Sequence, residues 1–243
     1  MTNLMVEVGA AWIICLLGGM PLFASMALAA LAFTALGGLS PSIVPQKMTQ
    51  AMNSFPIVAA PLFILMGNLL SASKITDRIV AFATALVGPI RGGYAHASIL
   101  SSIVFSGMVG SAVADAAGTG SVEIRAMRKV GYRAETAAAI TSAAATIGPI
   151  LPPSLPMVIL GVTANISIGG LFLAGVIPGL LMGVSLMVMT VFAARREGFP
   201  RHSFVGFRGM WTAFRDSFFA LMTPVILLGG MFSGMFTPTE AAA

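Results

Sequence analysis

Long apolar segments joined by short polar connections make up most of the chain. A helix that spans a membrane needs about 20 apolar residues. The candidate segments are Leu4–Leu36, Phe55–Ser71, Ile75–Ile90, Ala134–Ile150, Pro156–Ile166, Ile168–Ala194 and Phe218–Phe236. The pattern predicts an all-α polytopic membrane protein built as a multi-helix bundle, in which polar groups are buried between helices.

Two segments interrupt this apolar pattern. Ser106–Gly120 is rich in glycine, and Gly148–Pro156 contains four prolines and cannot be a continuous helix. The preceding Tyr94–Phe105 reaches only the middle of a bilayer at about 1.5 Å per residue. We therefore expect a re-entrant helical hairpin over residues 94–127 and a broken helix over residues 134–166. A further Gly-Gly-Met-Pro run at 18–21 is expected to kink the first segment.

A helix that is interrupted inside the membrane leaves backbone N–H and C=O groups without partners. Lipid cannot satisfy free N–H and C=O groups, so such breaks are buried in protein or line a watery cavity. Paired Gly- or Pro-broken segments indicate the binding site of a transporter.

The distribution of charge supports the hairpin. With the N-terminus outside and a hairpin that returns to its own side, all but two of the 13 Lys and Arg residues fall inside, which is the positive-inside pattern. The two outside are Lys74 and Arg78. Those inside are Lys47, Arg91, Arg125, Arg128, Lys129, Arg133, Arg195, Arg196, Arg201, Arg208 and Arg215. If residues 94–124 crossed the membrane once instead, every later loop would change sides and the excess of Lys and Arg on the inside would weaken.

Asp115 is expected to be the only acidic residue deep inside an apolar region. A charge there costs about 2.5–3.5 kcal/mol on insertion scales, which makes it a functional candidate. The alternative is a structural cap at the start of the returning helix. Hydroxyls and freed carbonyls suit Na⁺, although helix hydroxyls also bond their own carbonyls. The predicted Na⁺ ligands are Ser111, Asp115 and Ser154, and the wider sodium and substrate region is Ser106, Gly107, Gly110, Ser111, Asp115, Thr146, Gly148, Pro152, Pro153 and Ser154.

Other function classes find little support. HExxH, GxSxG, Walker A and CxxC motifs are absent, so we expect no enzyme and no cofactor apart from a coupling ion. The net charge is +5, but the basic residues lie in short loops between apolar segments, which argues against binding to nucleic acid. Cys15 is the single cysteine. Gly175, Gly179 and Gly183 are spaced by four and predict a close helix-packing face.

Several motifs resemble the large membrane subunit of TRAP (tripartite ATP-independent periplasmic) transporters, in family order over nearly the whole chain. They include Gly19-Met20-Pro21, the run from Phe55 to Asn68, Arg91-Gly92-Gly93, Gly110–Asp115, Gly131-Tyr132, Ile150–Ser154, Ser167-Ile168-Gly169, Leu171–Leu180 and Thr237–Ala243. Two positions differ from the family pattern: Val109 stands where a serine is usual at the hairpin tip, and Arg125 where a proline is common.

The resemblance implies a Na⁺-coupled secondary transporter that imports carboxylate solutes, such as C4-dicarboxylates or sugar acids, delivered by a periplasmic binding protein. A small TRAP membrane subunit is its implied partner, and the bacterial inner membrane its location. The implied fold consists of two inverted repeats that move as an elevator. We accordingly expect scaffold spans over 1–90, a transport core over 91–194, a basic interfacial segment over 195–217, and a lead-in span over 218–243.

Thr237–Ala243 resembles the lead-in to a second repeat, so we expect the chain to form an N-terminal portion with about half of the site. Two alternatives remain at this point. One is a fragment of a stand-alone anion/Na⁺ symporter that needs no binding protein. The other is a non-transporting membrane scaffold that docks a small partner.

Overall fold

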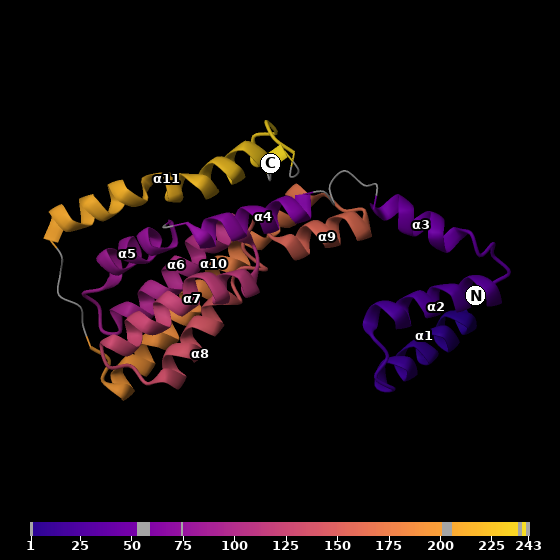
Figure 1. Cartoon of the computed structure of the whole chain (residues 1–243), viewed down its shortest axis with the longest axis horizontal. Helices are drawn as coiled ribbons and strands as arrows, with labels where there is room; N and C mark the ends of the chain where they lie inside the picture. Colours follow the sequence, from indigo (N-terminus) through magenta and orange to yellow (C-terminus); the bar gives the residue numbers. More distant parts are fainter. Residues whose placement is uncertain (1, 53–58, 74, 201–205, 238–239, 242–243) are drawn as a thin grey trace. The chain divides into compact units, whose positions relative to one another are not determined.

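The computed structural model describes residues 2–52, 59–73, 75–200, 206–237 and 240–241 (Figure 1). Within these residues the secondary structure is entirely helical, which confirms the predicted all-α class. The helices are α1 (Thr2–Leu17), α2 (Leu22–Leu36), α3 (Ile43–Met52), α4 (Ala59–Ala72), α5 (Ile75–Val87), α6 (Gly93–Val109), α7 (Ala112–Lys129), α8 (Ala134–Ala145), α9 (Leu155–Ala164), α10 (Ile168–Glu197) and α11 (Gly206–Phe232).

The chain forms two compact units, Met1–Ser54 and Phe55–Ala243. In the first unit the long apolar run is divided into α1 and α2, as the Gly-Gly-Met-Pro sequence predicts. Trp12 on α1 donates a hydrogen bond to the Ser25 hydroxyl on α2 (3.2 Å), which pairs the two helices. Pro45 lies in the first turn of α3, where a missing N–H costs little. The expected helix start at Phe55-Pro56 lies outside the described residues.

Helix α6 is the buried centre of the second unit and packs against α5, α7, α8, α10 and α11. It is longer than the 12-residue arm that the sequence predicts, because it continues through Ser106 and Gly107 to Val109. A Cβ atom at Gly107 would lie 2.8 Å from Cβ of Pro224 on α11, so a glycine is required for this close approach. The tertiary contact therefore keeps the glycine-containing turn helical.

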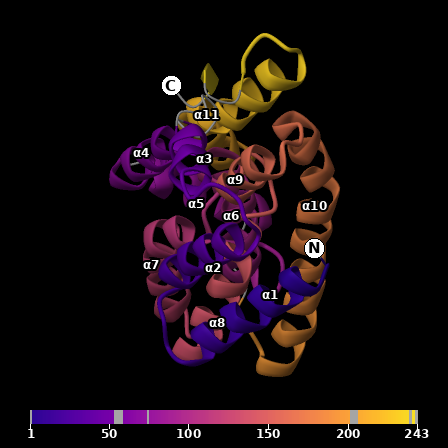
Figure 2. The ribbon, with the colours of Figure 1, turned by 90° about the vertical axis from the view of Figure 1, so that its right-hand side faces the viewer.

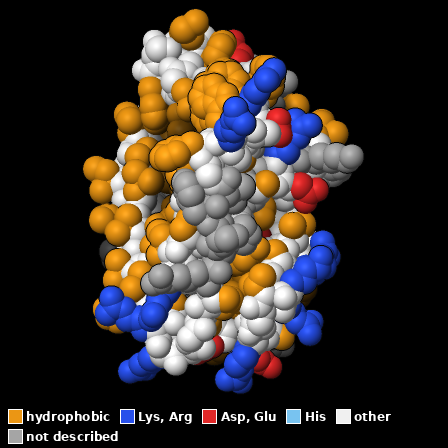
Figure 3. Space-filling model, turned by 90° about the vertical axis from the view of Figure 1, so that its left-hand side faces the viewer, with side chains coloured by type: hydrophobic (Ala, Val, Ile, Leu, Met, Phe, Trp, Pro, Cys, Tyr) orange, Lys and Arg blue, Asp and Glu red, His pale blue; other side chains and the backbone are white. Residues whose placement is uncertain are grey.

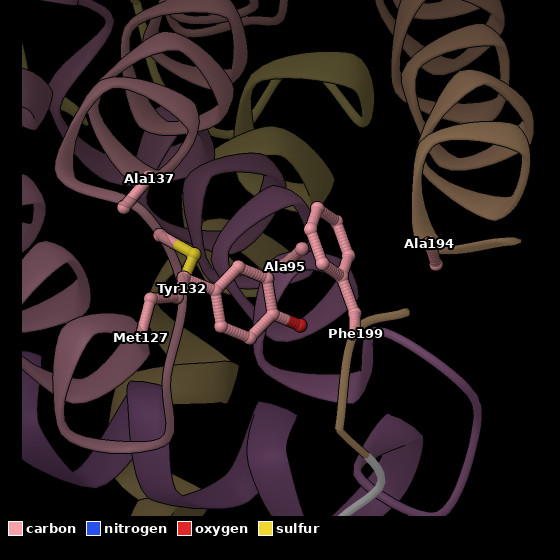
Figure 4. Close-up of a cluster of buried hydrophobic side chains, with 6 residues drawn as sticks. All are labelled: Ala95, Met127, Tyr132, Ala137, Ala194 and Phe199. Carbon is pink, nitrogen blue, oxygen red and sulfur yellow. The ribbon is translucent and has the colours of Figure 1, made fainter. Parts of the chain in front are cut away.

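Helices α6 and α7 form a hairpin whose two outer ends lie at the same end of the unit. Ala95 near the start of α6, Met127 near the end of α7 and Tyr132 share one buried cluster (Figure 4). Ala137 at the start of α8 and Ala194 at the end of α10 complete it, with Phe199. The chain thus leaves this end in α6 and returns to it in α7.

Basic side chains gather at this same end of the unit. Figure 3 shows Lys and Arg side chains around the rim of the molecule, with hydrophobic side chains between them. The exposed basic residues that flank the buried cluster in sequence are Arg91, Arg128, Lys129, Arg133, Arg195 and Arg196. Their common location is what the predicted positive-inside arrangement requires.

Tyr132 is the polar member of the buried cluster, and its ring packs 4.3 Å from that of Phe199 (Figure 4). Burial raises the pKa of its hydroxyl to about 12, whereas an unfolded tyrosine titrates near about 10. The protonated ring therefore stabilises the fold fully below about pH 10, and this contribution is lost as the pH rises to about 12.

We expect an ultraviolet absorbance titration of the folded chain to show a phenolate step near pH 12 that is missing in Tyr132→Phe. In denaturant the step should move to about pH 10. A folded titration that Tyr132→Phe leaves unchanged would contradict the assignment.

The predicted proline break is confirmed between α8 and α9, over residues 146–154. Helix α9 begins at Leu155, with Pro156 in its first turn, where proline is favoured. It ends at Asn165, which adopts the left-handed conformation (φ 56°). Helices α8 and α9 lie on either side of this break in the sequence and are both labelled in Figure 2.

The glycine face of α10 packs closely, as predicted. A Cβ atom at Gly179 would lie 3.3 Å from Cα of Leu151 in the proline break, and one at Gly183 would lie 2.6 Å from Cδ1 of Ile103 on α6. Gly175 approaches Met157 of α9 in the same way. The stripe therefore holds α10 against the broken helix and the hairpin.

Enlarging this face should destabilise the protein. We expect Gly179→Leu to lower the free energy of unfolding by about 1–3 kcal/mol, because the backbone at Leu151 must move. Gly229→Leu on α11 is the matched control, since no atom lies within 4 Å of its Cβ position. Equal unfolding midpoints in denaturant titrations of the two variants would contradict the packing role.

Helix α11 differs from the prediction. The basic segment was expected to form a separate interfacial element before a span, but residues 206–232 form one helix with Pro224 inside. Helices α10 and α11 are the two described helices long and apolar enough to cross a membrane. The functional division at residues 90, 194 and 217 stays a prediction.

A helix-start motif follows α11. The Thr237 backbone N–H and hydroxyl both donate to the Glu240 carboxylate (2.8 and 2.7 Å), and the Glu240 N–H donates to the Thr237 hydroxyl (3.3 Å). This is a capping box. The hydrogen bonds from Thr237 hold the pKa of Glu240 below its usual value.

Candidate functional site

The two interruptions lie against each other in the second unit. A Cβ atom at Gly148 would lie 3.3 Å from the Ala112 nitrogen, at the start of α7. A Cβ atom at Gly110 would collide with the Pro153 carbonyl and lie 2.8 Å from Cα of Ser154. The hairpin tip and the proline break therefore meet backbone to backbone, tightly at Gly148 and at a distance that only glycine allows at Gly110.

Four helix ends converge at this contact. Helices α6 and α8 end there, at Val109 and Ala145, and α7 and α9 begin there, at Ala112 and Leu155. The last carbonyls of a helix carry partial negative charge and its first N–H groups carry partial positive charge. The contact thus offers carbonyl oxygens for a cation and N–H groups for an anion.

Ser111 and Ser154 have equivalent places at this contact. Ser111 is the N-cap of α7 and accepts a hydrogen bond from the Ala114 N–H (3.4 Å). Ser154 is the N-cap of α9, accepts from the Met157 N–H (3.3 Å), and donates to the Pro149 carbonyl (2.6 Å). Both predicted Na⁺ ligands therefore have a structural role, and each hydroxyl oxygen keeps a second lone pair.

Asp115 is buried one turn inside α7 (1% exposed). The Thr119 hydroxyl donates to its Oδ1 atom (2.6 Å), and Ser102 of α6 lies beside it. The capping alternative is not what the structure shows, because the helix is capped by Ser111. Within the described residues, no hydrogen bond of normal geometry reaches the Asp115 Oδ2 atom or the Ser102 and Ser106 hydroxyls, although Ser102 lies close enough to Asp115 to interact with its carboxylate.

The other predicted residues divide into two groups. Gly148, Pro152 and Pro153 are buried in the break, with Gly110 at the tip. Thr146 is exposed and donates to its own helix carbonyl at Ala143 (2.6 Å), and Gly107 packs on α11 away from the tip. The structure thus joins the two breaks but does not bring every predicted residue to one point.

Sequence reasoning missed a second buried carboxylate. Glu123 is 2% exposed, so the expectation that Asp115 is the only deeply buried acidic residue was wrong. Its Oε2 and Oε1 atoms are in hydrogen-bonding contact with the hydroxyls of Ser98 and Ser101 of α6. A spacing of four along α7 is the signal that identifies it, since Asp115, Thr119, Glu123 and Met127 are all buried on one face.

Comparison with known proteins decides the family. The profile of the "Tripartite ATP-independent periplasmic transporter, DctM component" matches residues 10–243. The chain belongs to the DctM family of TRAP transporter components. It is 45% identical over 233 residues to the sialic acid TRAP transporter large permease protein SiaM of Vibrio cholerae, covering 96% of this chain and 55% of that protein.

Two further relatives carry sialic acid and C4-dicarboxylate in their names. The sialic acid TRAP transporter permease protein SiaT of Haemophilus influenzae is 42% identical over 95% of this chain and 38% of its own length. The C4-dicarboxylate TRAP transporter large permease protein DctM of Vibrio cholerae is 37% identical over 93% of this chain and 50% of its own length. The chain therefore spans about half the length of the large permeases it matches.

Proposed function

We propose that this DctM-family chain supplies half of the Na⁺ and solute site in the large permease subunit of a Na⁺-coupled secondary transporter that imports carboxylates. One observation carries the proposal: the hairpin tip and the proline break meet, so that two helix beginnings and two helix ends lie at one contact. Freed backbone groups of this kind bind substrates and ions in transporters with discontinuous helices.

Both ligands fit the charges that converge at this contact. The N-termini of α7 and α9 favour an anion, and a solute carboxylate accepts hydrogen bonds from N–H groups. Named solutes of the relatives support that class, since sialic acid, C4-dicarboxylates and 2,3-diketo-L-gulonate all carry a carboxylate. The class of solute therefore follows from chemistry that the family shares.

The Na⁺ ion requires oxygen ligands. We propose that it is bound by Asp115 with the free lone pairs of Ser111 and Ser154 and with carbonyls at the ends of α6 and α8. The buried Oδ2 atom of Asp115, which no hydrogen bond of normal geometry reaches, supports this choice, because a buried carboxylate is costly unless a cation or a proton neutralises it.

The same proposal includes the hairpin's place in the membrane. The basic end of the second unit lies at the cytoplasmic surface of the bacterial inner membrane, α6 and α7 enter and return as a re-entrant hairpin, and the N-terminus is periplasmic. A small TRAP membrane subunit and a periplasmic solute-binding protein complete the transporter. The clustered Arg and Lys residues at the outer ends of α6 and α7 support this orientation.

Reconstitution tests the proposal. The large permease that contains this chain is placed in proteoliposomes with the small subunit, and uptake of labelled C4-dicarboxylate and sialic acid is followed with and without binding protein. We expect uptake only with an inward Na⁺ gradient and with binding protein. Uptake without binding protein would favour the stand-alone symporter, and absence of uptake of any carboxylate would favour the scaffold.

A further inference from the structure

A closed group of polar side chains surrounds Glu123 in the interior of the second unit. Ser98 and Ser101 come from α6, Glu123 from α7 and Thr141 from α8, and all four are at least 97% buried. The Ser98 hydroxyl contacts Oε2 of Glu123 and the Ser101 hydroxyl contacts Oε1. Ser101 Oγ also lies 3.0 Å from the Ser98 carbonyl, and Ser98 Oγ lies 3.4 Å from Thr141 Oγ1.

For each of these four oxygen–oxygen contacts to have a hydrogen of its own, four hydrogen atoms are needed. The three hydroxyls supply three, since each carries one hydrogen. Thr141 donates to Ser98, and Ser98 donates to Oε2. Ser101 then faces two acceptors, the Ser98 carbonyl and Oε1 of Glu123. With an ionised Glu123 the single Ser101 hydrogen is shared between these two acceptors. A proton on Oε1 that donates to Ser101 lets the Ser101 hydrogen go to the Ser98 carbonyl, so that each of the four contacts has its own hydrogen.

The charges around Glu123 also favour a neutral acid. The elements packed against α7 are α4, α5, α6 and α8. Their titratable side chains are Asp77 and Arg78 on α5, Tyr94 and His96 on α6, and Glu135 on α8, and α4 has none. None of these forms an ion pair with Glu123 in the described part of the chain, and the charge that acts on it is that of Asp115, which is of the same sign. A buried charge without an opposite partner is neutralised by proton uptake.

We propose that Glu123 is a proton-binding site, separate from the Na⁺ position at the hairpin tip. Its bound proton, taken from water, sits between Oε1 of Glu123 and the Ser101 hydroxyl. It completes a cluster that ties both arms of the hairpin to α8. Loss of this proton leaves a buried negative charge and one fewer hydrogen among the contacts at the α6–α7–α8 junction, and this loosens the hairpin from the broken helix.

The direct contacts leave no room for a metal ion in place of the proton. Hydroxyl and carboxylate oxygens that touch at hydrogen-bonding distance cannot hold a cation between them. A glutamine at position 123 reproduces the protonated acid, because its amide oxygen accepts from Ser98 and its N–H donates to Ser101. Glu123→Gln therefore imitates the occupied proton site.

Infrared difference spectroscopy of the purified 243-residue chain tests the proposal. We expect the wild-type minus Glu123→Gln spectrum at neutral pH to contain the C=O stretching band of a protonated carboxylic acid, shifted in D₂O. Glu135→Gln is the matched control, because Glu135 is an exposed carboxylate on α8. Its difference spectrum should contain only carboxylate bands.

Thermal unfolding gives a second readout. We expect Glu123→Gln to keep the wild-type midpoint at neutral pH. Up to about pH 10, where Tyr132 is still protonated, it should hold this midpoint while the wild type loses stability. Carboxylate bands from Glu123 at neutral pH, or a Glu123→Gln midpoint well below that of the wild type, would overturn the proposal. Carboxylate bands that are absent from Glu123→Gln and that change between Na⁺ and choline would instead show Na⁺ bound at Glu123. None of these outcomes depends on transport.

Discussion

Replacing Asp115 with asparagine should abolish stabilisation of the folded chain by Na⁺. A ligand that binds only the folded state stabilises it by mass action, by about 2.7 kcal/mol at about 100 times its Kd. We expect the wild type to gain this amount in NaCl relative to choline chloride at equal ionic strength. Asparagine keeps the hydrogen bond from Thr119 but removes the charge that attracts the cation, so the gain should disappear.

In Na⁺-free buffer, the direction in which Asp115→Asn changes the unfolding temperature separates a binding role of Asp115 from a structural one. Without Na⁺ the wild type carries a buried, unpaired carboxylate oxygen. Asparagine lowers that cost, so the variant should unfold at the same temperature as the wild type or higher. A structural role predicts a lower temperature. Asp216→Asn, at an exposed position on α11, is the control and should keep the full Na⁺ response. A Na⁺ response retained by Asp115→Asn would exclude Asp115 as a ligand.

Gly110→Val should separate the hairpin tip from the proline break. Gly110 has a left-handed backbone (φ 61°), which costs about 1–2 kcal/mol for a residue with a side chain. Its Cβ would also collide with the Pro153 carbonyl, and forced overpacking costs about 1–3 kcal/mol more. We expect a total loss of about 2–5 kcal/mol in the free energy of unfolding, measured by denaturant titration.

Gly198→Val isolates the part that belongs to the contact. Gly198 ends α10 in the same way that Gly110 ends α6, with φ 68° and an N–H bonded four residues back, but no atom lies within 4 Å of its Cβ position. Gly198→Val should therefore lose only the about 1–2 kcal/mol of unfolding free energy that comes from the left-handed backbone. If the two variants are destabilised equally, the tip does not press against the break as the structure describes.

The breaks were the most predictable part of this fold. Glycine and proline act locally on the backbone, so the turn at residues 18–21 and the break before α9 follow from the sequence alone. Their mutual contact could be proposed but not located, because it depends on which glycines meet which carbonyls. Gly110 against Pro153 is a pairing that only three-dimensional packing specifies.

The errors also have physical causes. Ser106 and Gly107 look like the start of a break, but both continue α6, and Gly107 packs closely against Pro224 of α11. Glu123 stands in a polar stretch near Arg125 and Arg128 and therefore looks exposed, yet its face of α7 points to Ser98 and Ser101. The basic residues before residue 217 and the apolar residues after it differ in composition, yet residues 206–232 form the single helix α11, and an interfacial position of the basic part stays a prediction.

The account's central claim is that the two breaks form one ion-binding unit. Hydrogen exchange of backbone amides, followed by mass spectrometry on the purified chain in NaCl and in choline chloride, tests it most directly. We predict that Na⁺ slows exchange together in peptides covering residues 106–120 and 146–156, and that Asp115→Asn removes both effects. Protection of only one of these segments, or of neither, would contradict the claim.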